Sequence, residues 1–310
     1  MRIDNPFHEG EIQVQKRAGE FAEAQRNGRM LADSIMRGAM TFVAQQPMVI
    51  LGSVDEGKDL WASVLFGPPG FVRATDERRL EFDLSHAAFN EHDPFWENIQ
   101  HNPRVGALLI ELATRRRLRI NGTVARPVSD RLTLDVAESY PNCPKYIQRR
   151  QIQFEAVDRS ERVLAATDGN LLKGEQAALI EASDTFFVAS AHPQRGVDVS
   201  HRGGLPGFVE VLDKETLRIP DYVGNSMFNT LGNFMANPHA GLLFLDFEGS
   251  RTLQLTGRAE ILWDREDPVG RTGGTRRFWT LRIDRWRESA IHAGLRWEFV
   301  DYSPHHPQPS

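Results

Sequence analysis

The chain has 310 residues, of which 40% are hydrophobic and 25% charged, and its formal net charge is -5. This composition is typical of a globular protein, and the length suits about two domains. The net negative charge argues against a nucleic-acid-binding protein, which needs a concentrated positive surface.

The sequence argues against disulfides, metal sites, secretion and membrane insertion. The single cysteine, Cys143, excludes an intramolecular disulfide and a thiolate-rich metal site. No His-Glu-x-x-His motif or compact histidine and carboxylate cluster indicates a metal. The N-terminus is polar where a signal peptide is apolar, and no stretch reaches the roughly 18 apolar residues of a spanning helix. We therefore expect a cytoplasmic protein with no metal and no membrane contact.

The first half of the chain divides into three predicted regions. Residues 1–40 are expected to form a helical extension, with helix from Ala18 to Met40. Residues 41–127 contain short apolar runs bounded by Gly, Pro and Asp, which predict a small β-barrel. Residues 128–184 are charged and are expected to form a helical linker, which ends in an amphipathic segment at Leu171 to Ser183.

The second half repeats the β pattern. Residues 185–263 contain several short strand-like runs, interrupted by the sequence NSMFNTLGNFMANP. In this sequence Met227, Leu231 and Phe234 have helical spacing, and the helix is expected to stop at Asn237-Pro238. Residues 264–310 are expected to add one strand and a tail that is disordered after Pro304.

An internal repeat underlies both halves. GPPGFVRATDERRLEF, from Gly67, aligns with GLPGFVEVLDKETLRI, from Gly204, at an offset of 137 residues. ENIQHNPRVGALLIEL, from Glu97, aligns with GNFMANPHAGLLFLDF, from Gly232, at an offset of 135. About 80 residues are therefore written twice in the same order, which indicates two barrels of the same kind.

The second copy resembles a known family. Its SHRGGLPGF, PDYVGN and NPHAGLLF motifs, together with YPNCPKYIQRR at residues 140–150, are similar in order and spacing to the flavin-binding split-barrel proteins related to pyridoxamine 5'-phosphate oxidase. The resemblance implies a mainly β fold with flanking helices, in which two tandem split barrels form a pseudo-dimer. It also implies that FMN binds in a groove between the barrels.

Only the second copy has a phosphate-binding sequence. Arg202 offers a guanidinium fork, and Gly203 and Gly204 offer a backbone that a ligand can approach. The aligned positions of the first copy are Leu65 and Phe66, followed by Gly67. The first groove is therefore expected to be degenerate.

The resemblance implies cofactor-binding roles whose alternatives stay open from sequence. Ser200 recurs as Ser63, so a structural hydroxyl competes with a ligand contact. His201 faces either the flavin or solvent, and Lys145 is either a phosphate contact or a solvated lysine. Cys143 is either a small buried residue or a nucleophile. The expected cofactor-binding residues are Ser200, His201, Arg202, Gly203, Pro220, Asp221, Tyr222, Asn225, Ser226, Thr230 and Lys145.

The implied activity is that of an FMN-dependent oxidoreductase, in which the flavin supplies the redox chemistry. No catalytic residue is identified. One alternative is a haem-binding or haem-degrading split-barrel protein with His292 or His305 as the iron ligand. Another is a non-catalytic flavin-binding or electron-relay module. The expected partners are a small-molecule substrate or redox partner, a separate reductase and a second copy of the chain.

Overall fold

We describe the protein from a computed structural model, which covers residues 6–128, 130–154, 166–290 and 295–307. The first half forms a seven-stranded antiparallel sheet in the order β2-β1-β5-β6-β7-β4-β3, curled around one apolar interior. Its strands are β1 (Met48–Val54), β2 (Leu60–Phe66), β3 (Val72–Asp76), β4 (Arg79–Asp83), β5 (Arg104–Glu111), β6 (Arg116–Val128) and β7 (Arg131–Pro141).

The second half forms an eight-stranded sheet in the matching order β11-β10-β14-β15-β16-β13-β12, with β9 paired to β16. It also encloses its own apolar interior. The strands are β9 (Ala166–Gly169), β10 (Thr185–His192), β11 (Gly196–Gly203), β12 (Glu210–Val211), β13 (Thr216–Pro220), β14 (His239–Asp246), β15 (Arg251–Leu262) and β16 (Phe278–Ala290). The predicted fold of two tandem split barrels is confirmed.

Strand registers confirm the repeat at single-residue level. Met48 pairs with Phe66 between β1 and β2, as Thr185 pairs with Gly203 between β10 and β11, at an offset of 137. Between the next strands, Glu111 pairs with Arg116 as Asp246 pairs with Arg251, at an offset of 135. The two-residue difference lies in the loops before the barrel helices, at residues 84–93 and 221–228.

Each barrel has one helix before its first strand and one before its middle hairpin. The first barrel has α3 (Met40–Ala44) and α4 (Pro94–His101), and the second has α5 (Gly174–Ala182) and α6 (Asn229–Ala236). Helix α4 begins at Asp93, whose side chain accepts a hydrogen bond from the Phe95 N–H. Helix α6 ends before Asn237-Pro238 as predicted, and α4 ends before the corresponding pair Asn102-Pro103.

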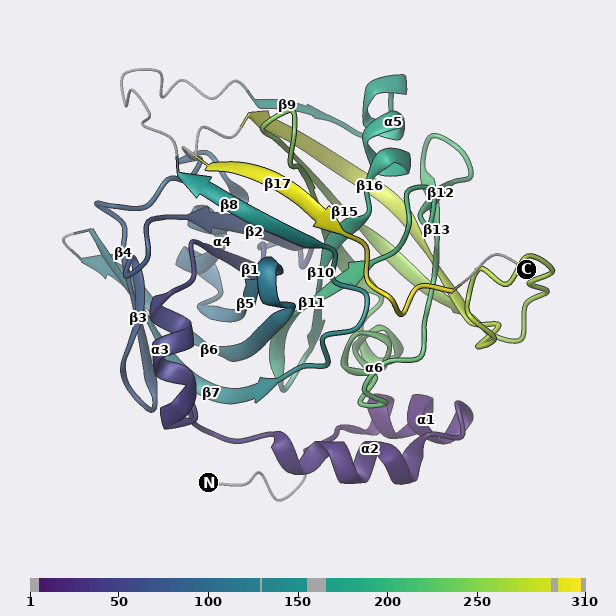
Figure 1. Ribbon diagram of the computed structural model, residues 1–310, viewed down its shortest axis with the longest axis horizontal. Coiled ribbons are helices and arrows are strands. Elements are labelled where there is room, and N and C mark those ends of the chain that lie inside the picture. The colour runs from purple at the N-terminus through teal and green to yellow at the C-terminus, as the bar shows by residue number, and fades with distance from the viewer. Residues whose placement is uncertain (1–5, 129, 155–165, 291–294, 308–310) are drawn as a thin grey trace.

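The two barrels pack through a shared apolar layer. Strand β1 is buried on both faces: Val49 and Leu51 point into the first barrel, while Met48 and Ile50 point toward the second. The facing strands of the second barrel contribute Phe187 and other residues to the same layer. Figure 1 shows the first barrel on the left and the second on the right. The arrangement is the pseudo-dimer expected from sequence.

The N-terminal extension lies against the second barrel. It contains α1 (Glu9–Arg17), α2 (Phe21–Asn27) and the short 3-10 turns Gly28–Met30 and Arg37–Ala39. The sequence predicted helix only from Ala18, but α1 begins earlier and Gly19, with φ of +73°, separates it from α2. Figure 1 shows α1 and α2 below α6, at the bottom of the view.

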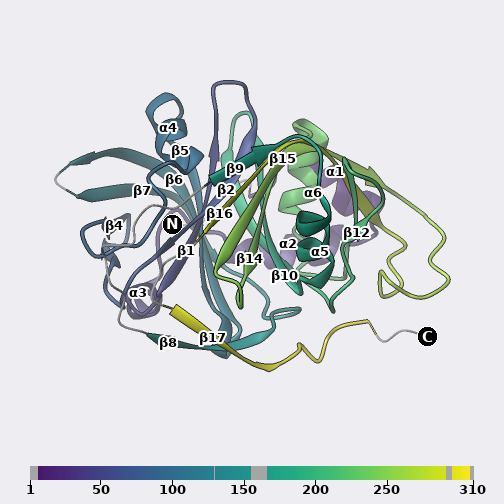
Figure 2. The same ribbon diagram turned by 90° about the horizontal axis from the view of Figure 1, so that it is seen from above.

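Much of the expected helical linker is β-structure, and its predicted helix at Leu171 to Ser183 is present as α5. Strand β7 completes the first sheet, and β8 (Arg149–Phe154) pairs with β17 (Leu295–Asp301) in a separate ribbon. Strand β7 alternates between buried and exposed residues, which is the strand period, and this alternation outweighs the charge of the segment. Figure 2 shows the β8–β17 ribbon along one edge, away from α4.

The C-terminal region also differs from expectation. Strand β16, which lies beyond the predicted barrel boundary at residue 263, is hydrogen bonded to β15 and β13 within the second sheet. The tail after Pro304 was expected to be disordered. In the part of it that the structure describes, His306 is buried and its Nε2 lies 2.9 Å from Oε1 of Gln148. Among the described helices, none has the length and apolar character needed to span a bilayer.

Candidate functional site

A groove between the barrels collects most of the predicted site residues. Water-sized molecules can occupy about 100 Å³ of it. Strand β11, the loop 221–228 and the start of α6 form one wall, and β6 and the segment after β7 form the other. The predicted residues along it are Ser200, His201, Arg202, Gly203, Asp221, Tyr222, Asn225, Ser226, Thr230 and Lys145. Pro220 is buried at the end of β13 beside them.

The strand alternation of β11 separates its three adjacent site residues. Ser200 and Arg202 pair with Val188 and Phe186, whose side chains belong to the second-barrel interior. His201 lies on the opposite face, where its ring contacts Phe187 in the layer between the barrels. Of the two alternatives given for this ring, a flavin or solvent, its burial excludes solvent. Burial and the nearby Arg117 and Arg202 lower its pKa well below the usual range, so the imidazole is neutral.

Arg202 has no anionic partner among the described residues. Its one hydrogen bond there runs from Nη1 to the carbonyl oxygen of His201, at 3.2 Å, and its buried Nε has no acceptor. Burial lowers the pKa of Arg202; attraction by Asp221 and Asp198, which lie beyond ion-pair distance, opposes this effect, and repulsion by Arg119 adds to it. A guanidinium held in this way is suited to receive an anion.

The glycines next to Arg202 have packing roles. A side chain at Gly203 would lie 2.0 Å from the carbonyl oxygen of Tyr146, and one at Gly204 would overlap the ring of Phe208. The first copy repeats the second contact, since Gly67 lies against Phe71 in the same way. The sequence interpretation of Gly204 as ligand-approach backbone is therefore replaced by a role in barrel packing.

Two arginines that the sequence analysis missed reach the groove from the first barrel. Arg117 donates from Nε and Nη2 to the carbonyl oxygen of Cys143, at 2.9 and 2.6 Å. Burial, with repulsion by Arg119, lowers the pKa of Arg117 to about 9. Arg117 and Arg119 are two residues apart, and this spacing could have identified them from sequence, because alternate residues of one strand face the same side. At the aligned positions the second copy has the neutral residues Thr252 and Gln254.

Arg119 connects the two walls. Its guanidinium forms a buried ion pair with Asp198 at 3.1 Å and donates to Oγ of Ser200 at 2.6 Å. Ser200 in turn lies 3.0 Å from Oγ1 of Thr230. The hydroxyls of Ser200 and Thr230 are thus already engaged, which supports the structural interpretation of both.

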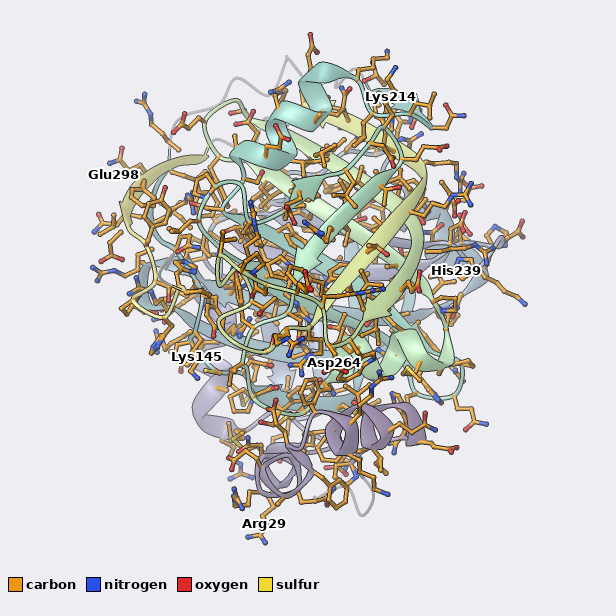
Figure 3. The ribbon with its side chains drawn as sticks, turned by 90° about the vertical axis from the view of Figure 1, so that its right-hand side faces the viewer. Arg29, Lys145, Lys214, His239, Asp264 and Glu298 are labelled. Carbon is orange, nitrogen blue, oxygen red and sulfur yellow. The ribbon has the colours of Figure 1, made fainter. Side chains whose placement is uncertain are left out.

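The segment after β7 supplies aromatic and cationic groups. Lys145 and Cys143 are half-buried in the groove wall, and no ion pair of Lys145 is present among the described residues. In Figure 3 Lys145 lies on the flank below Glu298 and opposite His239. The rings of Tyr146 and Tyr222 are 4.8 Å apart. Burial raises the pKa of Tyr146 to about 12, so its hydroxyl is a hydrogen-bond donor at neutral pH.

Other predicted residues are held by the protein itself. Asp221 accepts a 2.6 Å hydrogen bond from Nε of Arg277 in a buried ion pair. Asn225 donates to Asn142 across the groove at 3.3 Å. Ser226 donates to Glu20 of the extension at 2.7 Å. These side chains shape the groove, and their polar atoms are used within the chain.

The equivalent groove of the first copy is closed. Ala88, in the loop before α4, exchanges two backbone hydrogen bonds with Phe66 of β2, at 3.0 and 2.7 Å. Leu65, aligned with Arg202, is buried in the first-barrel interior. The loop therefore covers the strand whose counterpart, β11, is open to the second groove.

Polar contacts beneath the closed groove mirror those of the open one. Ser63, aligned with Ser200, donates to Asp93 at 2.5 Å, and Gln254, aligned with Arg119, donates to both of them at 3.2 and 3.1 Å. Within the described residues the framework is shared, but Arg117, Lys145 and Arg202 line the second groove only.

Metal and haem ligands receive no support from the described residues. No group of three or more His, Cys, Asp or Glu side chains there is arranged to hold a metal ion. Of the two late histidines considered as haem ligands, His305 is exposed and does not line the groove. His292 lies outside the described residues.

The sequence was then compared with known proteins. The family model for pyridoxamine 5'-phosphate oxidase matches the chain twice, over residues 37–167 and 172–290. The chain belongs to the pyridoxamine 5'-phosphate oxidase family. The second match ends at the last residue of β16, in agreement with the place of that strand in the second barrel.

Solved structures of modest similarity align with about one copy. They include a Clostridium acetobutylicum protein related to general stress protein 26, with 16% identity, coverage of 41% of this chain and 92% of that chain, and a TM-score of 0.29. HupZ from Group A Streptococcus has 17% identity, coverage of 37% and 92%, and a TM-score of 0.31. A FAD-binding protein from Mesorhizobium loti has 14% identity, coverage of 41% and 98%, and a TM-score of 0.28. No curated protein matches the sequence.

Proposed function

We propose that the chain is an FMN-binding oxidoreductase that holds one flavin in the groove between its two barrels. The observation that carries the proposal is the set of three groove cations, Arg117, Lys145 and Arg202, which have no carboxylate within ion-pair distance among the described residues. All three side chains are half-buried, and a cation partly withdrawn from water without a counter-ion is costly unless an anion binds it. Family membership supports a flavin as the source of that anion.

The phosphate of FMN would be held by these cations. A phosphate monoester has between one and two negative charges near neutral pH, and an arginine fork matches its oxygens. Arg202 comes from the second barrel, whereas Arg117 and Lys145 come from the first half of the chain. A groove assembled in this way needs no second copy of the chain, so homodimerisation is not required for binding.

The remaining groove residues would orient the flavin and limit its contact with water. Tyr146 and Tyr222 offer aromatic surface on one side, and Phe228 lines the groove at the start of α6. Bound FMN supplies hydride or electron transfer, which explains why no acid and base pair is needed in the groove. A small-molecule substrate or a separate reductase would supply electrons, and we place the protein in the cytoplasm because its one cysteine needs no oxidising compartment.

The experiment is a titration of the purified chain with FMN, followed by flavin absorbance and by quenching of flavin fluorescence. The expected result is saturation at one FMN per chain with an oxidised-flavin spectrum. The absence of saturable FMN binding would contradict the proposal. A sharp haem band in the purified protein would favour the haem alternative. Turnover with NADH or NADPH and an electron acceptor then distinguishes an enzyme from an electron-relay module.

A further inference from the structure

Residues 6–31 of the N-terminal extension donate hydrogen bonds to backbone carbonyl groups of the loop that lines the groove. We call residues 221–228 the site loop. Nδ2 of Asn27 donates to the carbonyl oxygen of Asn225 at 2.8 Å, and Nε2 of the buried Gln15 donates to that of Met227 at 3.0 Å. Both contacts join segments about 200 residues apart in sequence. The site loop therefore obtains hydrogen bonds from the extension that its own sequence neighbours do not provide.

Carboxylates of the extension bind side chains of the same region. Glu20 accepts from Ser226 at 2.7 Å and lies 3.9 Å from Arg277, the partner of Asp221. Glu11 accepts from Nδ2 of Asn229, the first residue of α6, at 2.6 Å. The direct contacts thus run from Asn225 of the site loop to the helix that follows it.

The extension docks where α1 and α6 come into backbone contact. A Cβ atom at Gly10 would lie 2.4 Å from the carbonyl oxygen of Gly232, and one at Gly232 would lie 2.6 Å from Cα of Glu11. Glycine is required at both positions for this approach. The aligned residue of α4 is Glu97, whose side chain is incompatible with the same contact. The extension therefore recognises the second-copy helix and not the first.

The site loop has a backbone that outside contacts must hold in place. Ser226 and Phe228 are non-glycine residues in the left-handed region, with φ of +62° and +60°. Such conformations are unfavourable and persist only where surrounding contacts fix them. The counterpart loop of the first copy lacks the extension and is hydrogen bonded to β2 through Ala88, which closes its groove.

We propose that the extension is a positioning device that keeps the site loop away from β11 and so keeps the second groove open for its ligand. Asn27, Gln15 and Glu20 are the positioning residues, and they act through Asn225, Met227 and Ser226. The inference rests on the proposed function for the identity of the ligand. The contacts between the extension and the site loop do not depend on it.

The test uses the full-length, cofactor-free chain and hydrogen–deuterium exchange of the amides in residues 221–230. Asn27→Asp keeps the side-chain shape but removes the donor, and Glu20→Ala removes the acceptor of Ser226. Each is expected to raise exchange in this segment by about three- to tenfold, as the loss of one hydrogen bond would. Exchange in β14 should stay unchanged, which separates local release of the loop from general destabilisation.

Two matched variants complete the test. Gln25→Ala alters an exposed residue of α2 and should leave exchange unchanged. Glu20→Gln keeps an acceptor oxygen and should restore most of the protection that Glu20→Ala loses. Site-loop exchange that is unchanged in both Asn27→Asp and Glu20→Ala would overturn the inference, as would equal effects of Glu20→Gln and Glu20→Ala.

FMN affinity is a separate measurement on the same proteins. Asn27→Asp is expected to raise the FMN Kd by about three- to tenfold. Increased exchange with an unchanged Kd would contradict the ligand-positioning role. If the wild-type chain does not bind FMN, the proposed function fails, whereas the exchange result still decides whether the extension holds the loop.

Discussion

The two grooves of this protein are built from aligned strands, aligned helices and a loop of similar length. Beneath both lies a serine of the outer strand, Ser63 or Ser200, bonded to a polar residue from the opposite barrel. In the first copy that residue is the neutral Gln254, and the loop closes on β2. In the second it is Arg119, and the loop stands off β11. The comparison teaches that a duplicated framework can keep its packing while the charges that line its two grooves differ.

The largest expected difference is in the free energy of unfolding, and it concerns the polar residue that bonds to the serine of the opposite barrel. Arg119→Met leaves Asp198 buried without its cation, which typically costs about 3–5 kcal/mol of unfolding free energy. Gln254→Met removes a neutral donor and should cost about 1–3 kcal/mol. Denaturant unfolding of both variants measures the difference. Equal losses would mean that the two positions are energetically equivalent despite their different charges.

The second-largest expected difference between the two grooves is in FMN affinity. Arg202→Met keeps the side-chain stem but removes the guanidinium, and FMN affinity is expected to fall more than about tenfold, or roughly 1.5–3 kcal/mol. Leu65→Met is the matched control, because Leu65 is buried in the first barrel and a smaller residue would leave a cavity. Fluorescence titration gives both affinities. Similar FMN affinities for the two variants would contradict a single cationic site.

The docked extension introduces a pH dependence through Glu11 of α1. Burial raises the pKa of Glu11 from 4.5 to about 8, and the nearby Asp198 and Glu138 contribute in the same direction. Because the folded chain then binds more protons than the unfolded chain, this contribution to stability is complete below about pH 4.5 and is lost as pH rises toward 8.

Glu11→Gln should flatten this decline, by on the order of 3 kcal/mol between pH 5 and 8. Unfolding curves at several pH values measure the slope of stability for both proteins. A slope that is the same in Glu11→Gln and in the wild type would show that Glu11 does not titrate in this range.

The smallest expected effect tests what the grooves share. Ser63→Ala and Ser200→Ala each remove a hydroxyl that bonds to the protein, and each should cost about 0.5–1.5 kcal/mol of stability. Similar losses are expected in both copies. If Ser200→Ala left stability unchanged and weakened only FMN binding, a ligand role for Ser200 would replace the structural one.

Much of the fold was predictable because it is encoded in local patterns. The repeat offsets of 137 and 135 recur as strand registers, and α6 ends before Asn237 as its spacing indicated. The linker prediction was wrong over β7, where charged residues on the exposed face conceal a strand alternation. Charge content alone is a poor guide to helix when one face of a strand meets water.

The candidate site was only half predictable. Arg202 stood out because its aligned residue is Leu65, and the structure places it in the groove with most of the other predicted residues. Arg117 and Arg119 were overlooked because they belong to the degenerate copy. Their alignment with the neutral Thr252 and Gln254 could have identified them, because strand alternation places both arginines on one face.

The sequence by itself determined that two similar barrels exist and that one copy has a guanidinium where the other has an apolar side chain. A repeat and a period-two pattern are properties of the order of residues along the chain, so both can be detected without a structure. Only the tertiary structure decided that cations from the first barrel complete the second groove and that His201 is buried between the barrels. It alone showed α1 docked on α6. These outcomes depend on contacts between segments far apart in sequence, whose relative positions are set by packing of the whole molecule.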